Sequence, residues 1–446
     1  MNKLVVFSTI AACGALPYVA EAKPKSKPVN FVVIYCDDMG YGDLSCYGSP
    51  SIKTPNLDRM AIEGQKWSSF YSAASVSTPS RAALLTGRYP MRNGQTNVYF
   101  PDSHGGLPQS EVTIASLLKS RDYVTACVGK WHLGHQEEFL PLNHGFDYFY
   151  GIPYSNDMSR KEQDILGNFG YQYELPFFNQ NEVIEYDPDQ SLFTRRLTEY
   201  AVDFIEEHRR EPFFLYLAHP QPHIPVYRSD GFQGRSAKGK YGDVIEELDW
   251  SVGEILAALM DNGLADNTLV VFSSDNGPWL ITEYESGSAG TLRDGKKSAY
   301  EGGFRVPGIF WGAMVEPGYV TDMGATLDLL PTMCELAGVE LPGDRTLDGQ
   351  SLVEVLGGRS DSPRDELVYY RTDELYALRK GDYKIIYATK PTYAKGERVK
   401  IVFDTPQLYN VAVDAEERYN IAADHPEIVK ELQALTEKHR ESIREF

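Results

Sequence analysis

Phe31-Val32-Val33-Ile34-Tyr35-Cys36 is a continuous apolar run, and the acidic pair Asp37-Asp38 follows it directly. A strand covered by helices on both faces is apolar at every position, so this run predicts a central strand of a buried sheet. Runs of the same character occupy residues 124–128, 213–218 and 269–272. Between them, apolar residues recur three or four positions apart, most clearly from Val244 to Leu259, as in amphipathic helices. This alternation predicts an α/β fold with a helix-covered sheet.

The character of the sequence changes after residue 365. Short apolar runs at residues 366–370, 375–379, 383–387 and 406–409 predict a small antiparallel sheet, with turns such as Lys380-Gly381-Asp382 between them. A last helix is expected from near Asp424, with Ile428, Leu432 and Leu435 facing inward. We therefore expect a large α/β domain at residues 23–365 and an α+β subdomain at residues 366–446, packed closely enough to share a site.

Residues 1–22 have the pattern of a secretory signal peptide. Lys3 supplies a positive charge, residues 4–16 are mostly apolar, and Ala20-Glu21-Ala22 fits signal-peptidase cleavage. This apolar run is too short to span a bilayer, so we expect an exported protein, periplasmic or secreted, without stable membrane insertion. A lipoprotein is the alternative, because Ile10-Ala11-Ala12-Cys13 resembles a lipoprotein box that would leave Cys13 lipidated.

The formal net charge of −20 excludes nucleic acid and anionic membrane surfaces as expected partners. An anionic substrate would need a local cluster of Arg and Lys side chains. The cysteines that would remain after cleavage match no zinc pattern, and they are Cys36, Cys46, Cys127 and Cys334. Buried free thiols are the expectation, with a Cys36–Cys46 disulfide as the alternative.

Unusual polar groups follow each predicted strand of the large sheet. Asp37-Asp38 follows the first, Gly129-Lys130-Trp131-His132 the second, His219 and Pro222-His223 the third, and Asp275-Asn276 the fourth. Ligands of open α/β sheets bind beyond the carboxyl ends of the strands, so these groups predict one shared site. Asp37, Asp38, Asp275 and Asn276 offer hard oxygen donors, which suit Ca²⁺ or Mg²⁺ rather than zinc.

The sharpest motif is Ser77-Thr78-Pro79-Ser80-Arg81, which continues through Ala82-Ala83-Leu84-Leu85 to Thr86-Gly87-Arg88. Pro79 suits the first turn of a helix, and Gly87 can end it. Ser77 is therefore expected at a helix N-terminus, where free N–H groups favour an anion. Arg81 lies one turn further on and can fork onto an oxyanion. The structural alternative is that Ser77 merely caps the helix.

Together these motifs resemble the type I, formylglycine-dependent sulfatases, and in particular their arylsulfatase A branch. The resemblance also rests on Asp37-Asp38-Met39-Gly40-Tyr41-Gly42-Asp43, Gly151-Ile152-Pro153-Tyr154-Ser155, residues 292–296 and Tyr300-Glu301-Gly302-Gly303. It runs in matching order from about residue 30 to the end. It implies an alkaline-phosphatase-like mixed central sheet sandwiched by helices, with a smaller C-terminal antiparallel sheet plus helix.

The resemblance implies a nucleophile made after translation. In this family the first position of the motif is Cys or Ser, oxidised to formylglycine, and here it is Ser77. Ser77 replaces the Cys of the eukaryotic members, which implies a bacterial member matured by a radical enzyme, the route of anaerobic bacteria. The hydrated aldehyde attacks sulfur through one hydroxyl and displaces the alcohol, and the other hydroxyl then loses its proton and expels sulfate.

The resemblance also implies the role of each site residue. One Ca²⁺ per chain would be held by Asp37, Asp38, Ser77, Asp275 and Asn276. Arg81 and Lys130 would hold the diol, and His132 would be the base that releases sulfate. His223 and Lys296 would bind the sulfate and protonate the leaving oxygen, with a hydrogen bond from Ser155. Lys297 departs from the family pattern, since it stands where Gly is common.

Two rival functions remain open from the sequence. One is a phosphoester or phosphonate monoester hydrolase of the same superfamily, and the other is a non-catalytic binder of sulfated glycans with Ser77 unmodified. For the sulfatase, an exported enzyme is expected to meet sulfated saccharides rather than free aryl sulfates. The acidic surface favours attack at chain ends or on short oligosaccharides, because a long polyanion is repelled.

Overall fold

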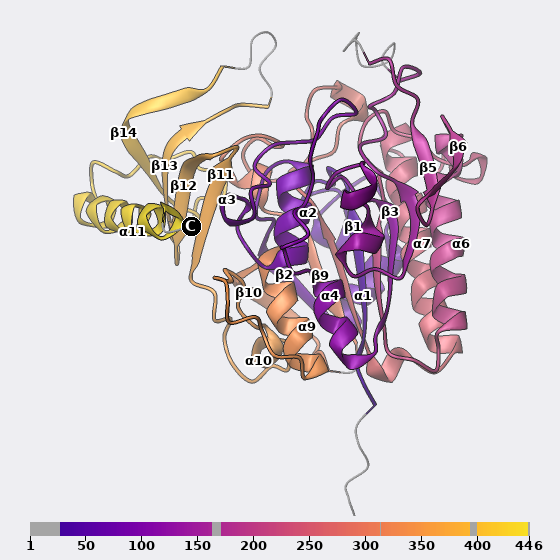
Figure 1. Ribbon diagram of the computed structural model, residues 1–446. Coiled ribbons are helices and arrows are strands. Elements are labelled where there is room, and N and C mark those ends of the chain that lie inside the picture. The colour runs from indigo at the N-terminus through magenta and orange to yellow at the C-terminus, as the bar shows by residue number, and fades with distance from the viewer. Residues whose placement is uncertain (1–26, 163–170, 313, 393–398, 445–446) are drawn as a thin grey trace, which may run out of the picture.

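The computed structural model describes residues 27–162, 171–312, 314–392 and 399–444. The predicted signal peptide and Cys13 lie outside these residues. Most of the described chain builds a large mixed sheet with helices on both faces (Figure 1). The strands, in their order across the sheet, are β10 (Gly318–Ala325), β2 (Gln65–Tyr71), β9 (Gly308–Trp311), β8 (Thr268–Ser274), β1 (Asn30–Cys36), β7 (Phe213–Ala218), β3 (Val124–Lys130), β4 (Tyr148–Ile152), β5 (Pro176–Asn179) and β6 (Glu182–Tyr186).

The central strands β8, β1, β7, β3 and β4 run parallel, so their carboxyl ends share one edge. β9 pairs antiparallel with both β8 and β2, and β5 and β6 continue the other side as antiparallel strands. The predicted central strands are confirmed. The central strand β4 and the outer strands β2, β9, β10, β5 and β6 were not predicted, because their runs are short or interrupted by polar residues.

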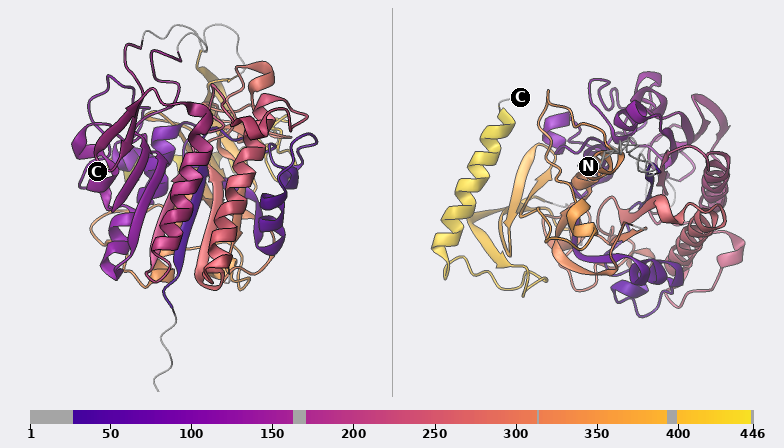
Figure 2. Two further views of the ribbon diagram at one scale, coloured as in Figure 1. Left: turned by 90° about the vertical axis from the view of Figure 1, so that its right-hand side faces the viewer. Right: turned by 90° about the horizontal axis from the view of Figure 1, so that it is seen from below.

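Alternate side chains of β1 enter two separate apolar cores. Val32, Ile34 and Cys36 belong to one core, while Phe31 and Tyr35 belong to the other. The first core is closed by α1 (Pro55–Glu63), α6 (Phe193–Glu207) and α7 (Lys240–Asp261); the second by α2 (Ser77–Thr86), α4 (Ile114–Leu118), α9 (Leu329–Ala337) and α10 (Val353–Leu356). Figure 2 shows α6 and α7 lying side by side across one face. This double coverage explains why the run has no polar alternation.

The second sheet is antiparallel and is formed by β11 (Glu366–Arg371), β12 (Glu374–Lys380), β13 (Tyr383–Thr389) and β14 (Ile401–Asn410). The predicted boundary at residue 365 falls immediately before β11. Helix α11 (Pro426–Arg444) begins two residues after the predicted start and covers the outer face of this sheet (Figure 2). Leu432 is buried, and Ile428 and Leu435 are partly buried beneath the helix.

A buried ion cluster joins the small sheet to the large domain. The ammonium of Lys384, on β13, lies 2.9 Å from Glu301 Oε1 and 2.9 Å from Glu417 Oε1, and all three side chains are 0% exposed. Glu301 opens the short helix α8 (Glu301–Phe304), and its other oxygen accepts a hydrogen bond from the Tyr71 hydroxyl at 2.6 Å. The small sheet is therefore joined to the large domain through the interior of the protein.

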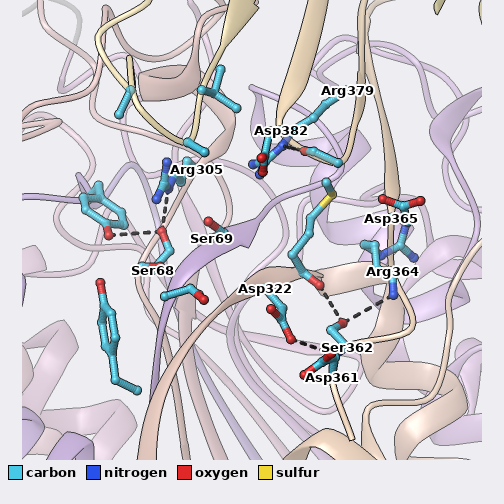
Figure 3. A pocket seen from close by; sticks show the side chains of 18 residues that line it. Ser68, Ser69, Arg305, Asp322, Asp361, Ser362, Arg364, Asp365, Arg379 and Asp382 are labelled. Atoms are coloured by element: carbon cyan, nitrogen blue, oxygen red, sulfur yellow. Dashed lines mark hydrogen bonds between the residues drawn. The ribbon is translucent and has the colours of Figure 1, made fainter. Parts of the chain in front are cut away.

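A cavity of about 620 Å³ lies where the large domain meets the small sheet (Figure 3). It contains none of the predicted site residues. The guanidinium groups of Arg305, Arg364 and Arg379 border it, and each is already engaged by a neighbour: Ser68 O at 2.5 Å, Asp328 Oδ2 at 2.8 Å and Gly381 O at 2.7 Å, respectively. We therefore regard this cavity as part of the domain junction.

Further features concern the cysteines and membrane insertion. Cys36, Cys46, Cys127 and Cys334 are free thiols, three of them buried, so the disulfide alternative is wrong. Within the described residues, no helix has the length and apolar character needed to cross a membrane.

Candidate active site

Ser77 is the first residue of α2, at the carboxyl edge of the parallel strands. Val76 before it is extended, and Gly87 ends the helix with φ 65° while its N–H donates to Ala83 O at 2.9 Å. The Ser77 side chain is 2% exposed, and its hydroxyl donates to Asp37 Oδ1 at 3.1 Å. The helix N-terminus therefore presents Ser77 directly to the acidic groups that follow β1.

The acidic groups after β1 and β8 form one buried cluster. The N–H of Asp38 donates to Asp275 Oδ1 at 3.1 Å, and Nδ2 of Asn276 donates to Asp38 Oδ1 at 2.6 Å. Asp37, Asp38, Asp275 and Asn276 are each at most 3% exposed. The parallel pairing of β1 with β8 explains this proximity. Cys36 is paired in register with Ser274, so the residues that follow the two strands lie next to each other.

These oxygens fit a hard divalent cation. The Oδ1 atom of Asn276 is buried and has no hydrogen-bond partner among the described residues, although a buried amide oxygen normally has one. Carboxylate and amide oxygens are the donors that Ca²⁺ prefers. The tightest group of potential ligands joins Asp37 and Asp38 with His223 rather than with Asp275. We favour the oxygen donors, because carboxylate and amide oxygens suit a hard cation and the Oδ1 atom of Asn276 has no other hydrogen-bond partner among the described residues.

Arg81 lies beneath the acidic cluster, one turn along α2. Its Nε and Nη2 atoms both donate to Asp275 Oδ2, at 3.1 and 3.0 Å, and its Nη1 donates to the carbonyl of Lys130 at 3.0 Å. The side chain is 0% exposed. The guanidinium therefore ties α2 to the ends of β8 and β3, and it holds its positive charge close to Asp37, at 3.6 Å.

The ammonium groups of two lysines contact Asp37 and Asp38. Lys130, the last residue of β3, donates to Asp37 Oδ2 and also donates to the hydroxyl oxygen of Ser155 at 3.0 Å. The ammonium of Lys296 lies 2.7 Å from Asp38 Oδ1. Both lysines are buried, so their charges are unscreened by water and act strongly on this cluster.

The pKa values of the Asp37 and Asp275 carboxyl groups are shifted in opposite directions. Burial by itself would raise the pKa of Asp37, but the cations of Lys130, Arg81 and Lys296 outweigh it and hold this pKa well below the usual range. Burial and the negative charge of Asp37 raise the pKa of Asp275 to about 7. Asp37 is therefore the firmly ionised member, and Asp275 is the member that can exchange a proton.

His132 and His223 each contact a residue beside the site. Thr78, next to Ser77, donates through its hydroxyl to the carbonyl of His132 at 2.8 Å. His223 Nε2 lies 3.5 Å from Asp38 Oδ2. Burial lowers the pKa of both imidazoles, with further lowering by Lys130 for His132 and by Lys296 for His223. Both rings are therefore neutral bases in the absence of a bound anion.

Other histidines near the motifs have structural surroundings. His219, directly after β7, lies with Nε2 3.1 Å from the Ser251 hydroxyl on α7, and burial lowers its pKa to about 3. His135 packs its ring edge-on to Tyr154. Neither contacts Ser77 or the acidic cluster through a hydrogen bond of the described residues. The sequence could not separate these histidines from His132 and His223.

The structure adds Asp157 and Trp279, which the sequence did not predict. The ring of Trp279 lies 5.5 Å from that of His223, and the ammonium of Lys296 lies 4.7 Å from its centroid. Asp157 Oδ1 is 3.9 Å from His223 Nδ1. Their positions gave some signal, since Trp279 follows Asp275-Asn276-Gly277 closely and Asp157 is two residues after Ser155.

Comparison with known proteins gives matches along nearly the whole described chain. The Sulfatase family model matches residues 29–339, and the model of the C-terminal region of aryl-sulfatase matches residues 362–446. Arylsulfatase A of Homo sapiens is 42% identical over 385 residues, covering 82% of this chain and 76% of that protein. N-acetylgalactosamine-6-sulfatase of Rattus norvegicus is 42% identical over 396 residues, covering 83% and 73%.

Among solved structures, similarity extends to a Bacteroides thetaiotaomicron protein from the metabolism of multiple glycosaminoglycans. The two chains are 31% identical and superpose with a TM-score of 0.81, over 93% of this chain and 99% of that one. The mixed sheet with a smaller C-terminal sheet is therefore shared with this protein.

Proposed function

Since this chain belongs to the sulfatase family and is a sulfuric ester hydrolase, we propose that its substrate is a sulfated saccharide and that its nucleophile is made from Ser77. The observation that carries the proposal is the position of Ser77 at the N-terminus of α2, 3.1 Å from Asp37, which is also contacted by the cationic side chains of Arg81 and Lys130. The similarity to an N-acetylgalactosamine-6-sulfatase and to a glycosaminoglycan-metabolising protein supports a saccharide.

We propose Ca²⁺ as the resident metal, held by Asp37, Asp38, Asp275 and Asn276 together with modified Ser77. When bound, the cation would polarise a sulfate oxygen and lower the pKa of the attacking hydroxyl. The all-oxygen donor set and the unpartnered Oδ1 of Asn276 support this assignment.

In the first step, a hydroxyl of the hydrated formylglycine at position 77 attacks sulfur, and the S–O bond to the saccharide breaks. Arg81 and Lys130 hold the diol and stabilise charge on the transferring group. We assign Asp275, beside Asp37 at the carboxyl end of β8, as the group that accepts the proton of the attacking hydroxyl. Lys296 and His223 bind the sulfate and supply the proton to the leaving oxygen, with Ser155 as a further hydrogen-bonding group.

In the second step, the remaining hydroxyl of position 77 loses its proton to His132. The C–O bond to sulfate breaks, sulfate leaves, and the aldehyde reforms and adds water. The arrangement of His132 supports this role, because its Nδ1 is buried without a hydrogen-bond partner while Nε2 lies 2.9 Å from the carbonyl of Tyr99. Nε2 therefore carries the proton, and Nδ1 keeps a lone pair that can accept one.

The proposal includes the cellular context of the protein. We propose export to the periplasm or the medium, directed by residues 1–22 or by lipidation of Cys13, and oxidation of Ser77 by a radical maturase. The sequence patterns described above support both points. We also propose residues 23–365 as the catalytic domain and residues 366–446 as the C-terminal subdomain, a division supported by the start of β11 at Glu366.

The test joins a mass measurement to a substrate screen. The protein is produced with and without a Ser-type maturase, and the tryptic peptide containing Ser77 is weighed. Oxidation removes about two hydrogens from the serine, a covalent change that mass spectrometry resolves. Sulfated galactose, N-acetylgalactosamine and glucosamine derivatives are then compared with phosphate and phosphonate monoesters.

We expect sulfate release only from the oxidised protein, and no release from Ser77→Ala. Equal turnover by the unoxidised protein would contradict a nucleophile made from Ser77. Faster hydrolysis of phosphate or phosphonate esters would instead favour the superfamily's other chemistry.

A further inference from the structure

Lys296 lies in a short segment, residues 293–301, whose backbone conformation is strained. Asp294, two positions before it, and Lys297, one position after it, have φ of 63° and 76°. Both values lie in the left-handed region, which disfavours residues with a side chain. Such a conformation persists only where the surrounding structure fixes it. The place of the Lys296 ammonium therefore depends on what holds this segment.

The small sheet holds the segment through buried hydrogen bonds. Thr389, the last residue of β13, is 1% exposed, and its hydroxyl oxygen accepts a hydrogen bond from the N–H of Ala299 at 3.2 Å. The same oxygen lies 3.4 Å from the hydroxyl oxygen of Ser298. Three residues further along the chain, the N–H of Thr392 donates to Asp294 Oδ1 at 3.0 Å. These bonds reach the segment on both sides of Lys296.

Glu417, in the chain that follows β14, holds the two ends of the same segment. Its backbone carbonyl accepts a hydrogen bond from Arg293 Nη1 at 2.7 Å. Its Oε2 atom accepts one from the N–H of Glu301, also at 2.7 Å, and the side chain is 0% exposed. Together with the bonds of Thr389 and Thr392, these contacts attach the segment to the C-terminal part of the chain at its ends and in its middle.

The Lys296 side chain extends from this segment to the active site. Its ammonium lies 2.7 Å from Asp38 Oδ1 and 4.7 Å from the ring centroid of Trp279. Its backbone N–H donates to the carbonyl of Pro278 at 2.9 Å. A lysine side chain loses much rotamer freedom when it is held in one geometry, so a site of this kind depends on a backbone that is fixed in advance.

We propose that Thr389 is a positioning residue for Lys296. Its buried hydroxyl fixes the backbone at Ser298 and Ala299, and thereby the ammonium that binds the sulfate group. The inference rests on the proposed function, in which Lys296 binds the reacting sulfate. It gives the C-terminal subdomain a part in sulfate binding, exerted through residues 293–301.

The test is a double-mutant cycle on the oxidised enzyme. Thr389→Val removes the hydroxyl, Lys296→Ala removes the ammonium, and a third variant combines both. The substrate is N-acetylgalactosamine 6-sulfate, or the saccharide that the screen above identifies, and inorganic sulfate is the inhibitor. Each variant is weighed at the Ser77 peptide, so that kcat/KM refers to oxidised protein alone.

We expect Thr389→Val to lower kcat/KM and to raise the inhibition constant of sulfate, each by about two- to tenfold, the equilibrium factor of one net hydrogen bond. Thr389→Ser keeps the hydroxyl and should restore both values. In the Lys296→Ala background, Thr389→Val should cause no further loss, because residues that act through one another are not additive. Additive losses would overturn the inference, since Thr389 would then act independently of Lys296.

Thr436→Val is the matched control for stability. Thr436, on α11, is also 1% exposed, and its hydroxyl donates to Leu432 O at 2.8 Å and accepts from the Tyr387 hydroxyl at 2.9 Å. Both Thr→Val variants should lower Tm, but only Thr389→Val should weaken inhibition by sulfate. An equal change of the inhibition constant in both variants, or in neither, would overturn the inference while the proposed function stands.

Lys296→Ala separates this inference from the proposed function. If oxidised Lys296→Ala kept the wild-type kcat/KM and inhibition constant, the proposed role of Lys296 would fail and the inference with it. If Lys296→Ala lost activity while Thr389→Val did not, only the inference would fail. Should Thr389→Val not fold, Thr389→Ala replaces it with the same expected outcomes.

Discussion

The imidazole of His132 has its two nitrogen atoms in different surroundings. Nε2 lies 2.9 Å from the carbonyl of Tyr99, and Nδ1 is buried without a hydrogen-bond partner in the described structure. Burial and the nearby charge of Lys130 hold the pKa of His132 well below its usual value. Its neutral form therefore persists as the pH falls through the range in which an ordinary histidine becomes charged.

We expect His132→Gln to lower kcat by about 10²- to 10⁴-fold, the usual contribution of a positioned base. Glutamine can still donate to the Tyr99 carbonyl, so the fold should persist. Mass spectrometry of the variant mixed with substrate should show retained sulfate, because the step that expels it is slowed. For wild-type enzyme, titration of His132 should produce no acidic limb in kcat between pH 5 and 8.

His135→Gln serves as the control, since it changes a nearby histidine that packs against Tyr154. It should leave kcat unchanged. If His132→Gln kept the wild-type kcat, or if the variant never retained sulfate, His132 would not be the base of the second step.

The site was predictable from the sequence where its residues lie in local patterns. Ser77 and Arg81 are one helical turn apart, and Asp37 and Asp275 directly follow apolar strands. Trp279 and Asp157 were not predicted as site residues, because their significance depends on tertiary contacts. The contacts of the Trp279 ring with His223 and Lys296, for example, are visible only when all its neighbours are placed.

At the scale of secondary-structure elements, the ends of β1 and β8 are joined by the proposed metal site. A ligand that binds only the folded protein stabilises it by RT ln(1 + [L]/Kd), about 2.7 kcal/mol at a hundredfold excess over Kd. Protein dialysed against a chelator should therefore gain a few degrees in Tm when Ca²⁺ is added, with less effect from equal Mg²⁺. Asn276→Ala should reduce the gain, and a Tm that ignores Ca²⁺ would contradict the assignment.

The contact between α8 and β13 depends on Lys384, which lies between Glu301 and Glu417. Lys384→Met leaves two buried carboxyl groups without their shared cation, which should cost about 3–5 kcal/mol of unfolding free energy. Lys380→Met removes a partly exposed lysine from the neighbouring strand and should cost less than about 1 kcal/mol. Urea denaturation measures the free energy of unfolding of both variants. Equal losses would show that burial of the ion cluster contributes little to stability.

The strands β1, β3, β7 and β8 could be predicted because each is apolar on both faces, whereas β4 and the outer strands could not. β2 reads Gln65-Lys66-Trp67-Ser68-Ser69-Phe70-Tyr71, with polar residues that interrupt the pattern. Several of these residues pack against β9, β10 and the small sheet instead of facing water. The sequence therefore predicts the centre of the large sheet better than its edges.

At the scale of the whole molecule, the net charge of −20 opposes the approach of a long polyanion. We expect sulfate release per ester to fall as the saccharide chain lengthens at low ionic strength. Added salt should reduce this difference, because the Debye length falls from about 30 Å at 0.01 M to 10 Å at 0.1 M. Release from intact polymer that exceeds release from its mono- and disaccharide units would contradict attack at chain ends.

The burial of Ser77 also sets an order of events in the cell. Ser77, at the start of α2, has only 2% of its surface accessible. Once the chain has folded, the catalytic centre of a second enzyme therefore cannot reach this side chain. The proposed oxidation therefore has to occur on the nascent or still unfolded polypeptide. The yield of active protein then depends on a race between maturation and folding, so slower folding at lower temperature should increase the oxidised fraction.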